Sequence, residues 1–290
     1  MTTLITALLL GSLTLLLLTA AVGIGAMVVP VARVPSPALA DCAIVVAGSS
    51  GTRLRRGLIG GIAASFVLIA LAVLLRAILA GRAPWSNLHE FSMAFAAALL
   101  GTYLVLARTN QIAGLAPFAA LLAAGLVGFA IGLDDRVDPL VPALQSPLLA
   151  IHVGSAALAY AVAGVAFLAA AAELGQRATG DGIGLLPSAE TARGVGHRAV
   201  LIAFPILTIA IALGSVWANL AWRSYWSNDP KELAAAATWL VFGAYLHVAG
   251  RRDRWERLAP WLIVLGFAGV LFTYIGAGLF FIGEHSYAAP

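Results

Sequence analysis

The chain has 290 residues, of which 61% are hydrophobic and only 10% are charged, and its mean hydropathy is +0.97. These values exclude an ordinary soluble domain and are typical of a protein that crosses a membrane many times. The net charge of +4 comes from basic residues scattered between apolar runs, a pattern that records membrane topology and gives no reason to expect nucleic-acid binding.

The first 80 residues hold two apolar segments and a single cysteine. Residues 1–29 have no basic stretch ahead of their long apolar run, so we expect a retained span there, although Ala38-Leu39-Ala40 resembles a signal cleavage site. Because Cys42 is the only cysteine, the chain has neither an internal disulfide nor a CxxC redox pair.

Eight apolar segments reach roughly the 20 residues needed to cross a bilayer. In chain order they are 5–29, 58–80, 91–107, 113–132, 148–172, 199–216, 233–249 and 259–281. The sequence therefore predicts an all-α transmembrane bundle of about eight spans. We divide it into N-terminal spans, 1–80, and a second domain, 81–290, which holds the motifs described below.

The basic residues predict the orientation of the bundle. If loops 30–57, 108–112, 173–198 and 250–258 face the cytoplasm, they collect twelve of the 17 Lys and Arg residues and leave five on the other side. We therefore expect both termini outside. The connection between the sixth and seventh spans then lies outside as well.

That connection carries an unusual aromatic segment, WANLAWRSYWSNDPKE, at residues 217–232. Its last four residues predict a helix start, with an Asp N-cap, Pro in the first position and Glu in the third. The preceding aromatic residues exceed an ordinary interfacial belt. Flat rings beside cations suit a planar, apolar ligand with two carboxylates, such as haem. The residues expected to contact it are Trp217, Trp222, Tyr225, Trp226, Asp229 and Lys231.

Haem iron also needs axial ligands, and neutral imidazole is a usual choice. The predicted topology places His89, His152 and His285 near the outer face, where the last two are the candidate ligands of a site beside the aromatic segment. For each, a hydrogen-bonded packing histidine is the alternative. On the inner side, His247 is a ligand candidate or an interfacial anchor beside Arg251 and Arg252, and His197 is expected to be solvated.

The aromatic segment resembles the tryptophan-rich WWD signature shared by the CcmC, CcmF and CcsA (ResC) families of haem-handling membrane proteins. Its place in the last third of the chain, and the ending Gly283-Glu284-His285-Ser286-Tyr287, are similar to CcsA. Ser86-Asn87-Leu88-His89-Glu90-Phe91 and Leu149-Ala150-Ile151-His152 resemble two other CcsA segments in the family's order. The family pattern WGxYWxWDPKE differs here at Arg223, which replaces Gly, and at Asn228, which replaces the last Trp; His89 replaces a Tyr.

The resemblance implies a membrane subunit of a system II cytochrome c synthase complex. Its substrate would be haem b, delivered across the membrane and attached to the CxxCH motif of an apocytochrome c on the outer side, with a CcsB (ResB) type membrane protein as partner. It also implies that His152 and His285 ligate iron at the outer site and that His247 holds haem on its way across. No residue of this chain is expected to act chemically on the substrate, because positioning would supply most of the catalysis.

Three other functions are alternatives to a synthase subunit, and each predicts something different. A haem exporter or chaperone would leave attachment to its partner, and the sequence does not separate it from a synthase. A b-type electron carrier would place paired histidines at both membrane depths, and a solute transporter would leave the aromatic segment unexplained. Sixteen Arg against one Lys indicates a GC-rich bacterial genome, which favours a plasma membrane over a thylakoid membrane.

Overall fold

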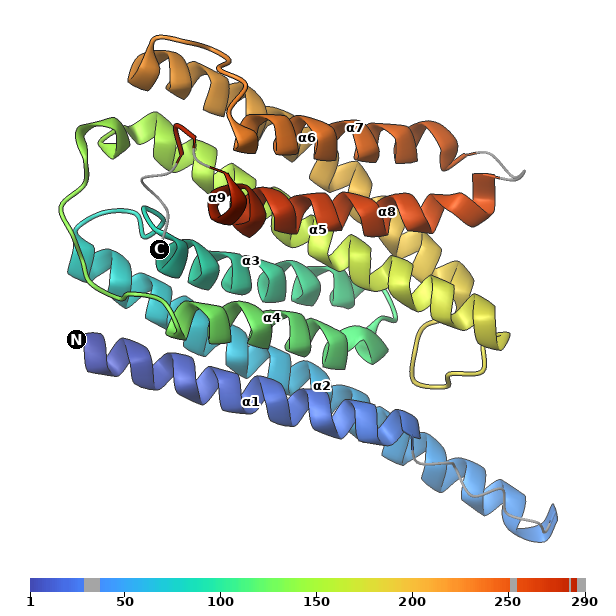
Figure 1. Ribbon diagram of the computed structural model, residues 1–290. Coiled ribbons are helices and arrows are strands. Elements are labelled where there is room, and N and C mark those ends of the chain that lie inside the picture. The colour runs from blue at the N-terminus through green and yellow to red at the C-terminus, as the bar shows by residue number, and fades with distance from the viewer. Residues whose placement is uncertain (29–36, 251–254, 282, 286–290) are drawn as a thin grey trace.

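The computed structural model describes residues 1–28, 37–250, 255–281 and 283–285. Within these residues all regular structure is helical, and the long helices lie side by side in one bundle (Figure 1). The main helices are α1 (Thr2–Val28), α2 (Pro37–Ala80), α3 (Leu88–Thr109), α4 (Ala116–Ile131), α5 (Pro147–Thr179), α6 (Ala189–Trp222), α7 (Pro230–Val248) and α8 (Trp255–Leu271). Shorter elements are the 3₁₀ turns η1 (Ala113–Leu115) and η2 (Pro142–Leu144), the π-helical segment η3 (Phe272–Gly276) and α9 (Ala277–Phe280).

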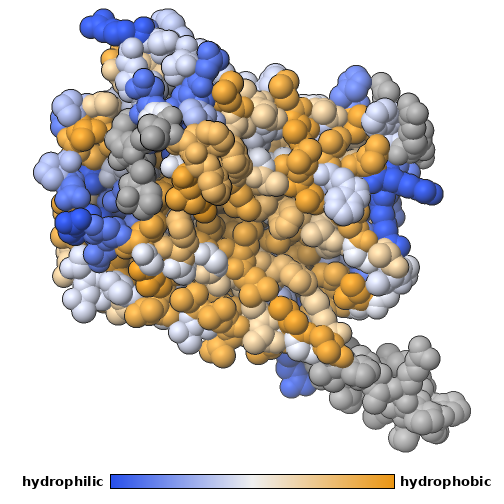
Figure 2. All heavy atoms as spheres, in the orientation of Figure 1, coloured by the Kyte–Doolittle hydropathy of each residue, from blue (hydrophilic) through white to orange (hydrophobic). Residues whose placement is uncertain are grey.

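Seven of the described helices are long and apolar enough to cross a membrane. The predicted span 233–249 corresponds to α7, which is not among the seven and carries Lys231 and Glu232 in its first turn. It nevertheless packs against α6 and α8 within the bundle (Figure 1). Figure 2 shows hydrophobic residues across the middle of one face and hydrophilic residues towards its two ends. The predicted all-α transmembrane bundle is therefore confirmed.

Several helices extend beyond the apolar segments that predicted them. The stretch 173–198, predicted as a loop, mostly continues α5 and α6, and α2 begins at Pro37, inside the predicted loop 30–57. Hydropathy marks the part of a helix that matches the lipid, whereas caps set its ends. Gly180, with φ of 60°, terminates α5, and the Ser188 side chain accepts a hydrogen bond from the first turn of α6.

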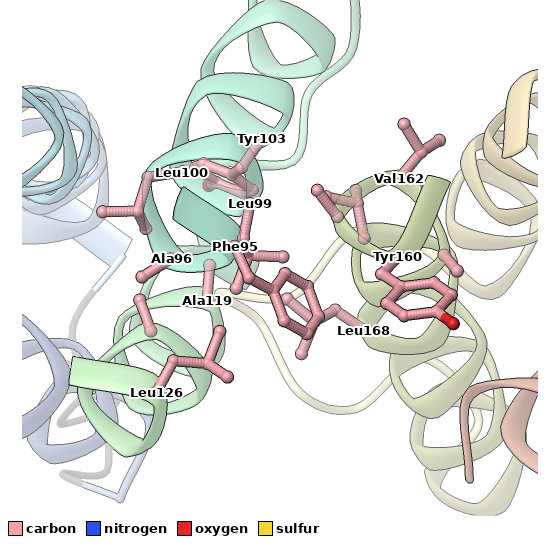
Figure 3. Packing of buried hydrophobic residues seen from close by; sticks show 14 of the residues in the cluster. Phe95, Ala96, Leu99, Leu100, Tyr103, Ala119, Leu126, Tyr160, Val162 and Leu168 are labelled. Atoms are coloured by element: carbon pink, nitrogen blue, oxygen red, sulfur yellow. The ribbon is translucent and has the colours of Figure 1, made fainter. Parts of the chain in front are cut away.

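The interior of the bundle is centred on α5, which packs against α3, α6 and α8. Phe95 and Leu99 of α3 and Val162 of α5 are fully or almost fully buried there (Figure 3). Because lipid chains are as apolar as leucine, burial of such residues drives little association within a membrane. Close packing and interhelical hydrogen bonds therefore hold the helices together.

The two ends of the bundle differ in their polar contacts. One end, called the cavity end, contains the start of α1, the first turns of α3, α5 and α7, the C-terminal end of α6, and α9 (Figure 1). At the opposite end, buried Glu173 of α5 pairs with Arg177 at 2.5 Å and with Arg193 of α6 at 3.1 Å. Arg193 also pairs with Glu256 of α8 at 2.6 Å, so this charge cluster joins three helices.

Candidate functional site

A cavity opens at the cavity end between α3, α5, α6, α7 and η3. It contains about 1210 Å³ of empty space, part of it open to solvent, and its lining is mostly apolar and aromatic. Six of the nine residues predicted for the site line it: His152, Trp217, Tyr225, Trp226, Lys231 and His285.

His285 is held by a carboxylate that does not line the cavity. Its Nδ1 lies 2.8 Å from Oδ1 of Asp229, whose side chain is 1% exposed. Asp229 also accepts a hydrogen bond from the backbone of Lys231 and caps α7, as the sequence predicts. Gly283 permits this arrangement, because a Cβ at that position would lie 2.2 Å from Oδ2 of Asp229. The carboxylate therefore contacts the imidazole and not the cavity.

The electrostatics of Asp229 follow from the same contacts. Burial alone would raise the pKa of the carboxyl, but the hydrogen bond and charge of His285, with backbone N–H donors, outweigh burial and lower the pKa to about 2. A carboxylate that stays ionised accepts only, so Nδ1 of His285 donates to it. Nε2 of His285 is then the ring nitrogen left for a ligand.

This pKa shift predicts a pH-dependent contribution to stability. A depressed carboxyl pKa stabilises the folded state fully above the ordinary value of 3.8, and the stabilisation is lost as the pH falls towards about 2. Asp229→Asn should keep the helix cap, since Asn caps as well as Asp, but should lose this contribution. Thermal unfolding in detergent should therefore show a difference from the wild type that is present just above pH 3.8 and shrinks as the pH falls towards about 2.

The control for this prediction is Asp138→Asn, a substitution at an exposed position of the α4–α5 connection. It should leave the unfolding temperature close to that of the wild type throughout the same pH series. A difference between the wild type and Asp229→Asn that persisted unchanged to pH 2 would contradict the assigned ion pair.

His152 is oriented by a backbone carbonyl. Its Nδ1 lies 2.8 Å from the carbonyl oxygen of Ala210 on α6. Since a carbonyl only accepts, Nδ1 carries the proton, and Nε2 again remains for a ligand. The contact requires glycine at position 214, because a Cβ there would lie 2.6 Å from Cε1 of His152. Both cavity imidazoles thus have their Nδ1 atoms fixed by oxygen acceptors.

Trp217 lies against both of these imidazoles. Its ring is nearly parallel to that of His152, with centroids 6.4 Å apart, and lies 6.1 Å from that of His285. Its indole N–H donates to the carbonyl of Ala143 at 3.1 Å, and the residue is 2% exposed. Trp222 does not line the cavity but packs edge-on against Trp217 and His285, at 4.9 and 5.0 Å. It therefore supports the other rings from behind.

The loop after α6 forms the mouth of the cavity. Tyr225 and Trp226 line it and are 59% and 41% exposed. Arg223 and Asn228 both adopt left-handed backbone conformations, with φ of 61° and 60°. A non-glycine residue pays roughly 1–2 kcal/mol for that conformation, so Arg223 occupies a position better suited to the family's Gly. Asn228 tolerates it, and its Oδ1 accepts a hydrogen bond from Nε1 of Trp226 at 2.9 Å.

Lys231 places a cationic side chain at the cavity. Its side-chain end lies beside Gly278, where a Cβ would be 3.8 Å from Nζ. Within the described residues the ammonium group has neither a hydrogen-bond acceptor nor an ion-pair partner at bonding distance. A cation facing an apolar cavity favours an anionic group on the ligand, because burial without a partner is costly.

The remaining histidines lie elsewhere. His247 is exposed in the last turn of α7, at the opposite end of the bundle, and does not line the cavity. His197, predicted to lie in a solvated loop, is a half-buried residue of α6 whose Nδ1 is 3.3 Å from the hydroxyl of Tyr245. His89 is buried, with Nδ1 2.8 Å from the carbonyl of Ala130. Arg251, Arg252, Ser286 and Tyr287 lie outside the described residues.

Other cavity residues were not singled out from the sequence. Trp85 and its neighbours Ser86 and Asn87 form one wall, although the resemblance marked only the segment from Ser86 onwards. Tyr160 of α5 and Tyr274 of η3 line the cavity too, and the Tyr274 hydroxyl contacts that of Ser92. A π-helical segment such as η3 often lies at a functional site, but no local pattern in the sequence predicts it.

The fold and cavity define a polytopic helical membrane protein with an aromatic, imidazole-lined site at one end of its bundle. The family described as cytochrome C assembly protein matches residues 85–285. A CcsA cytochrome c biogenesis protein of Parasynechococcus marenigrum (strain WH8102) is 34% identical over 258 residues, covering 78% of this chain and 84% of that protein. The CcsA protein of Synechococcus elongatus (strain ATCC 33912 / PCC 7942 / FACHB-805) is 34% identical over 259 residues, covering 72% and 80%. The chain belongs to the cytochrome C assembly protein family and, within it, to the CcsA family of cytochrome c biogenesis proteins.

The fold is similar to that of a solved haem lyase structure. The chain described as "Cytochrome c Heme Lyase CcmF" superposes with a TM-score of 0.63 at 19% sequence identity, covering 98% of this chain. The match covers 48% of the CcmF chain, so the present protein spans about half of its length. At this identity the similarity concerns the fold alone.

Proposed function

We propose that the chain binds haem b in the cavity and presents it for covalent attachment to the CxxCH motif of an apocytochrome c. The observation that carries the proposal is the pair of imidazoles, His152 and His285, whose Nδ1 atoms are both engaged by oxygen acceptors beside one buried indole. Histidines that bind metals commonly have this second hydrogen bond, which fixes the ring and makes Nε2 the ligand. Membership of the CcsA family supports the same function.

Each cavity residue has a role in this proposal. His152 and His285 hold the iron through Nε2, and Trp217 packs beside the macrocycle, where an indole face favours a flat ring. Tyr225 and Trp226 cover it at the mouth, while Lys231 pairs with a propionate. Asp229 and Trp222 act from behind by keeping His285 in place.

Attachment then requires little chemistry from this chain. The two thiols of a reduced CxxCH add across the vinyl groups of haem, so that each forms one S–C bond and its hydrogen goes to the other vinyl carbon. The histidine of the motif replaces one of the two cavity imidazoles on the iron. Holding the reacting groups together accounts for the rate enhancement expected from the protein.

The wider setting belongs to the same proposal. Residues 1–80 provide N-terminal spans and 81–290 the haem-handling domain, with both termini and the cavity end outside. Haem passes His247 on its way from the inner side, and a CcsB (ResB) type membrane protein completes the complex. We propose the bacterial plasma membrane as the location, because the composition is rich in Arg. The CcsA relatives named above come from cyanobacteria.

The direct test is a pyridine haemochrome assay of the detergent-purified protein, with and without its partner. We expect about one haem b per chain at the outer site, released as free haem because it is not yet covalently attached. Protein that remains free of haem after expression with excess haem, or after reconstitution, would overturn the proposal. Thioether formation on a CxxCH peptide, measured with and without the partner, separates a synthase subunit from a haem exporter.

A further inference from the structure

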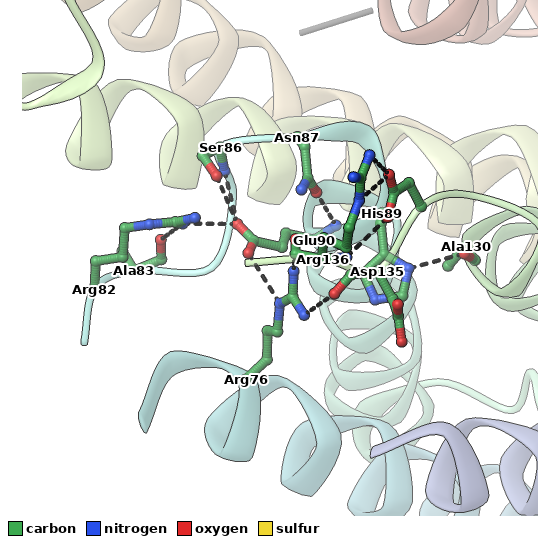
Figure 4. A network of polar contacts seen from close by, with 11 residues as sticks. Arg76, Arg82, Ala83, Ser86, Asn87, His89, Glu90, Ala130, Asp135 and Arg136 are labelled. Carbon is green, nitrogen blue, oxygen red and sulfur yellow. Dashed lines mark hydrogen bonds and ion pairs between the residues drawn. The ribbon is translucent and has the colours of Figure 1, made fainter. Parts of the chain in front are cut away.

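One wall of the cavity is tied to a buried charge network (Figure 4). Glu90, in the first turn of α3, is completely buried, and both of its carboxylate oxygens are engaged. Oε1 accepts from Nε of Arg76 at 3.0 Å. Oε2 accepts from Nη1 of Arg82 at 2.8 Å, and from the backbone N–H and hydroxyl of Ser86 at 3.0 and 2.9 Å. One carboxylate thus joins the end of α2, the α2–α3 loop and the start of α3.

Arg76 extends the network to a second connection. Its side chain is 1% exposed, and its two terminal nitrogens donate to the backbone carbonyls of Asp135 and Arg136, at 2.5 and 2.8 Å. These carbonyls belong to the α4–α5 connection, which continues to η2. There Ala143 accepts the indole N–H of Trp217. The network therefore braces two of the segments that surround the cavity.

Neither Glu90 nor its two arginine partners lines the cavity, yet the loop they hold does. Trp85, Ser86 and Asn87 are cavity residues. Ser86 belongs to both structures, since it lines the cavity and donates twice to Glu90. The carboxylate therefore bonds directly to a residue of the wall.

Stability alone is a weak reason to bury these charges. A buried ion pair is costly to desolvate, and apolar residues of similar volume often replace one without loss of stability. What such a network supplies is a defined geometry, because each donor and acceptor fits only one arrangement. The α2–α3 loop has no regular structure of its own between residues 81 and 87, so these contacts add to the few backbone hydrogen bonds that shape it.

We propose that Glu90 is a positioning residue for the haem site, which it serves by fixing the Trp85–Asn87 wall of the cavity through Ser86 and Arg82. This inference rests on the proposed function. It adds a residue that contacts neither haem nor the axial histidines and still sets how the macrocycle is held.

The molecule offers a matched control at its opposite end. Glu173 is also buried and also pairs with two arginines, Arg177 and Arg193. None of these three residues lines the cavity. Glu173→Gln therefore reproduces the loss of a buried carboxylate between two arginines without touching the cavity wall.

The first experiment needs no haem. Chymotrypsin cleavage after Trp85, followed by mass spectrometry of haem-free protein in detergent, reports how firmly the wall is held. Glu90→Gln should speed this cleavage several-fold, whereas Glu173→Gln should cleave there at the wild-type rate. Because Glu90→Gln leaves Arg76 buried without its carboxylate, Arg82→Gln serves as a milder second variant. Arg82 is 16% exposed, and its loss frees only the loop.

The second experiment measures haem. Glu90→Gln and Arg82→Gln should bind haem with affinity lowered by about tenfold, the scale seen for residues that orient metal ligands indirectly, and should shift the Soret band of the haem that remains. Glu173→Gln should match the wild type. If both variants kept the wild-type affinity, Soret band and cleavage rate, the positioning role of Glu90 would be overturned. Equal losses in Glu173→Gln would overturn it too. Neither result would touch the proposed function. A wild-type protein that binds no haem would overturn the proposed function, and this role with it.

Discussion

Replacing both His152 and His285 by alanine is expected to abolish haem binding at the cavity. Each imidazole has its Nδ1 held by an oxygen, so each offers Nε2, and no other histidine of the described residues lines the cavity. A single replacement should leave five-coordinate haem with a high-spin spectrum and weaker binding. The double replacement removes both iron ligands and should leave no haem signal in the absorption spectrum of the purified protein.

His197→Ala is the matched control for this experiment. His197 lies at the opposite end of the bundle, beside Tyr245, and its loss should leave the haem spectrum unchanged. Thermal unfolding should show that the double variant still folds, although it loses the ion pair of His285 with Asp229 as well as the His152 hydrogen bond, which costs about 1 kcal/mol. A double variant that kept the low-spin spectrum would show that other groups ligate the iron.

Gly214→Ala should damage the site almost as much while leaving both histidines in place. A Cβ at position 214 would lie 2.6 Å from Cε1 and 2.9 Å from Nδ1 of His152. The imidazole must then leave the carbonyl of Ala210 and its parallel packing on Trp217. We expect the low-spin spectrum to be lost and haem affinity to fall by about 10–100-fold, as when a ligand loses its orienting contact.

This substitution does not weaken the helix that carries it. Alanine is favoured over glycine inside a helix by about 0.8–1.0 kcal/mol, so α6 itself should be stabilised. Gly125→Ala in α4 is the control, because a Cβ there meets no atom within 4 Å. If Gly214→Ala bound haem with the wild-type spectrum, the orientation of His152 seen here would not be the one that ligates iron.

Arg223 and Asn228, which depart from the family pattern, lie in the loop at the mouth of the cavity. Both positions are left-handed, and the hydrogen bond from Trp226 to Asn228 holds an aromatic ring at the mouth in the absence of the family's last Trp. The loop is also tied by Ser215, whose hydroxyl donates to the carbonyl of Tyr225 at 2.8 Å. The departures from the pattern therefore leave the loop ordered and still aromatic.

Contacts between residues far apart in the chain were the hardest to predict from the sequence. Asp229 is expected to contact the ligand, and in the structure its carboxylate caps α7 and bonds to His285 without lining the cavity. The cap is a local property and was predicted correctly. The bond joins residues 56 positions apart, and no local pattern encodes it. The same reasoning applies to Glu90, which reads as an ordinary first-turn acid until Arg76 is placed beside it.

By itself the sequence determined the class of this protein, its approximate spans and the aromatic end on which the proposed site lies. Length and hydropathy decide which segments can cross a membrane, and caps and prolines act over a few residues, so both are legible along the chain. Only the tertiary structure decided which imidazole meets which oxygen, that Gly214 leaves room for His152, and that the wall at Trp85 depends on Glu90. Those features arise where separate helices meet, and helix packing in a membrane is set by the fit of their surfaces, which hydropathy does not record.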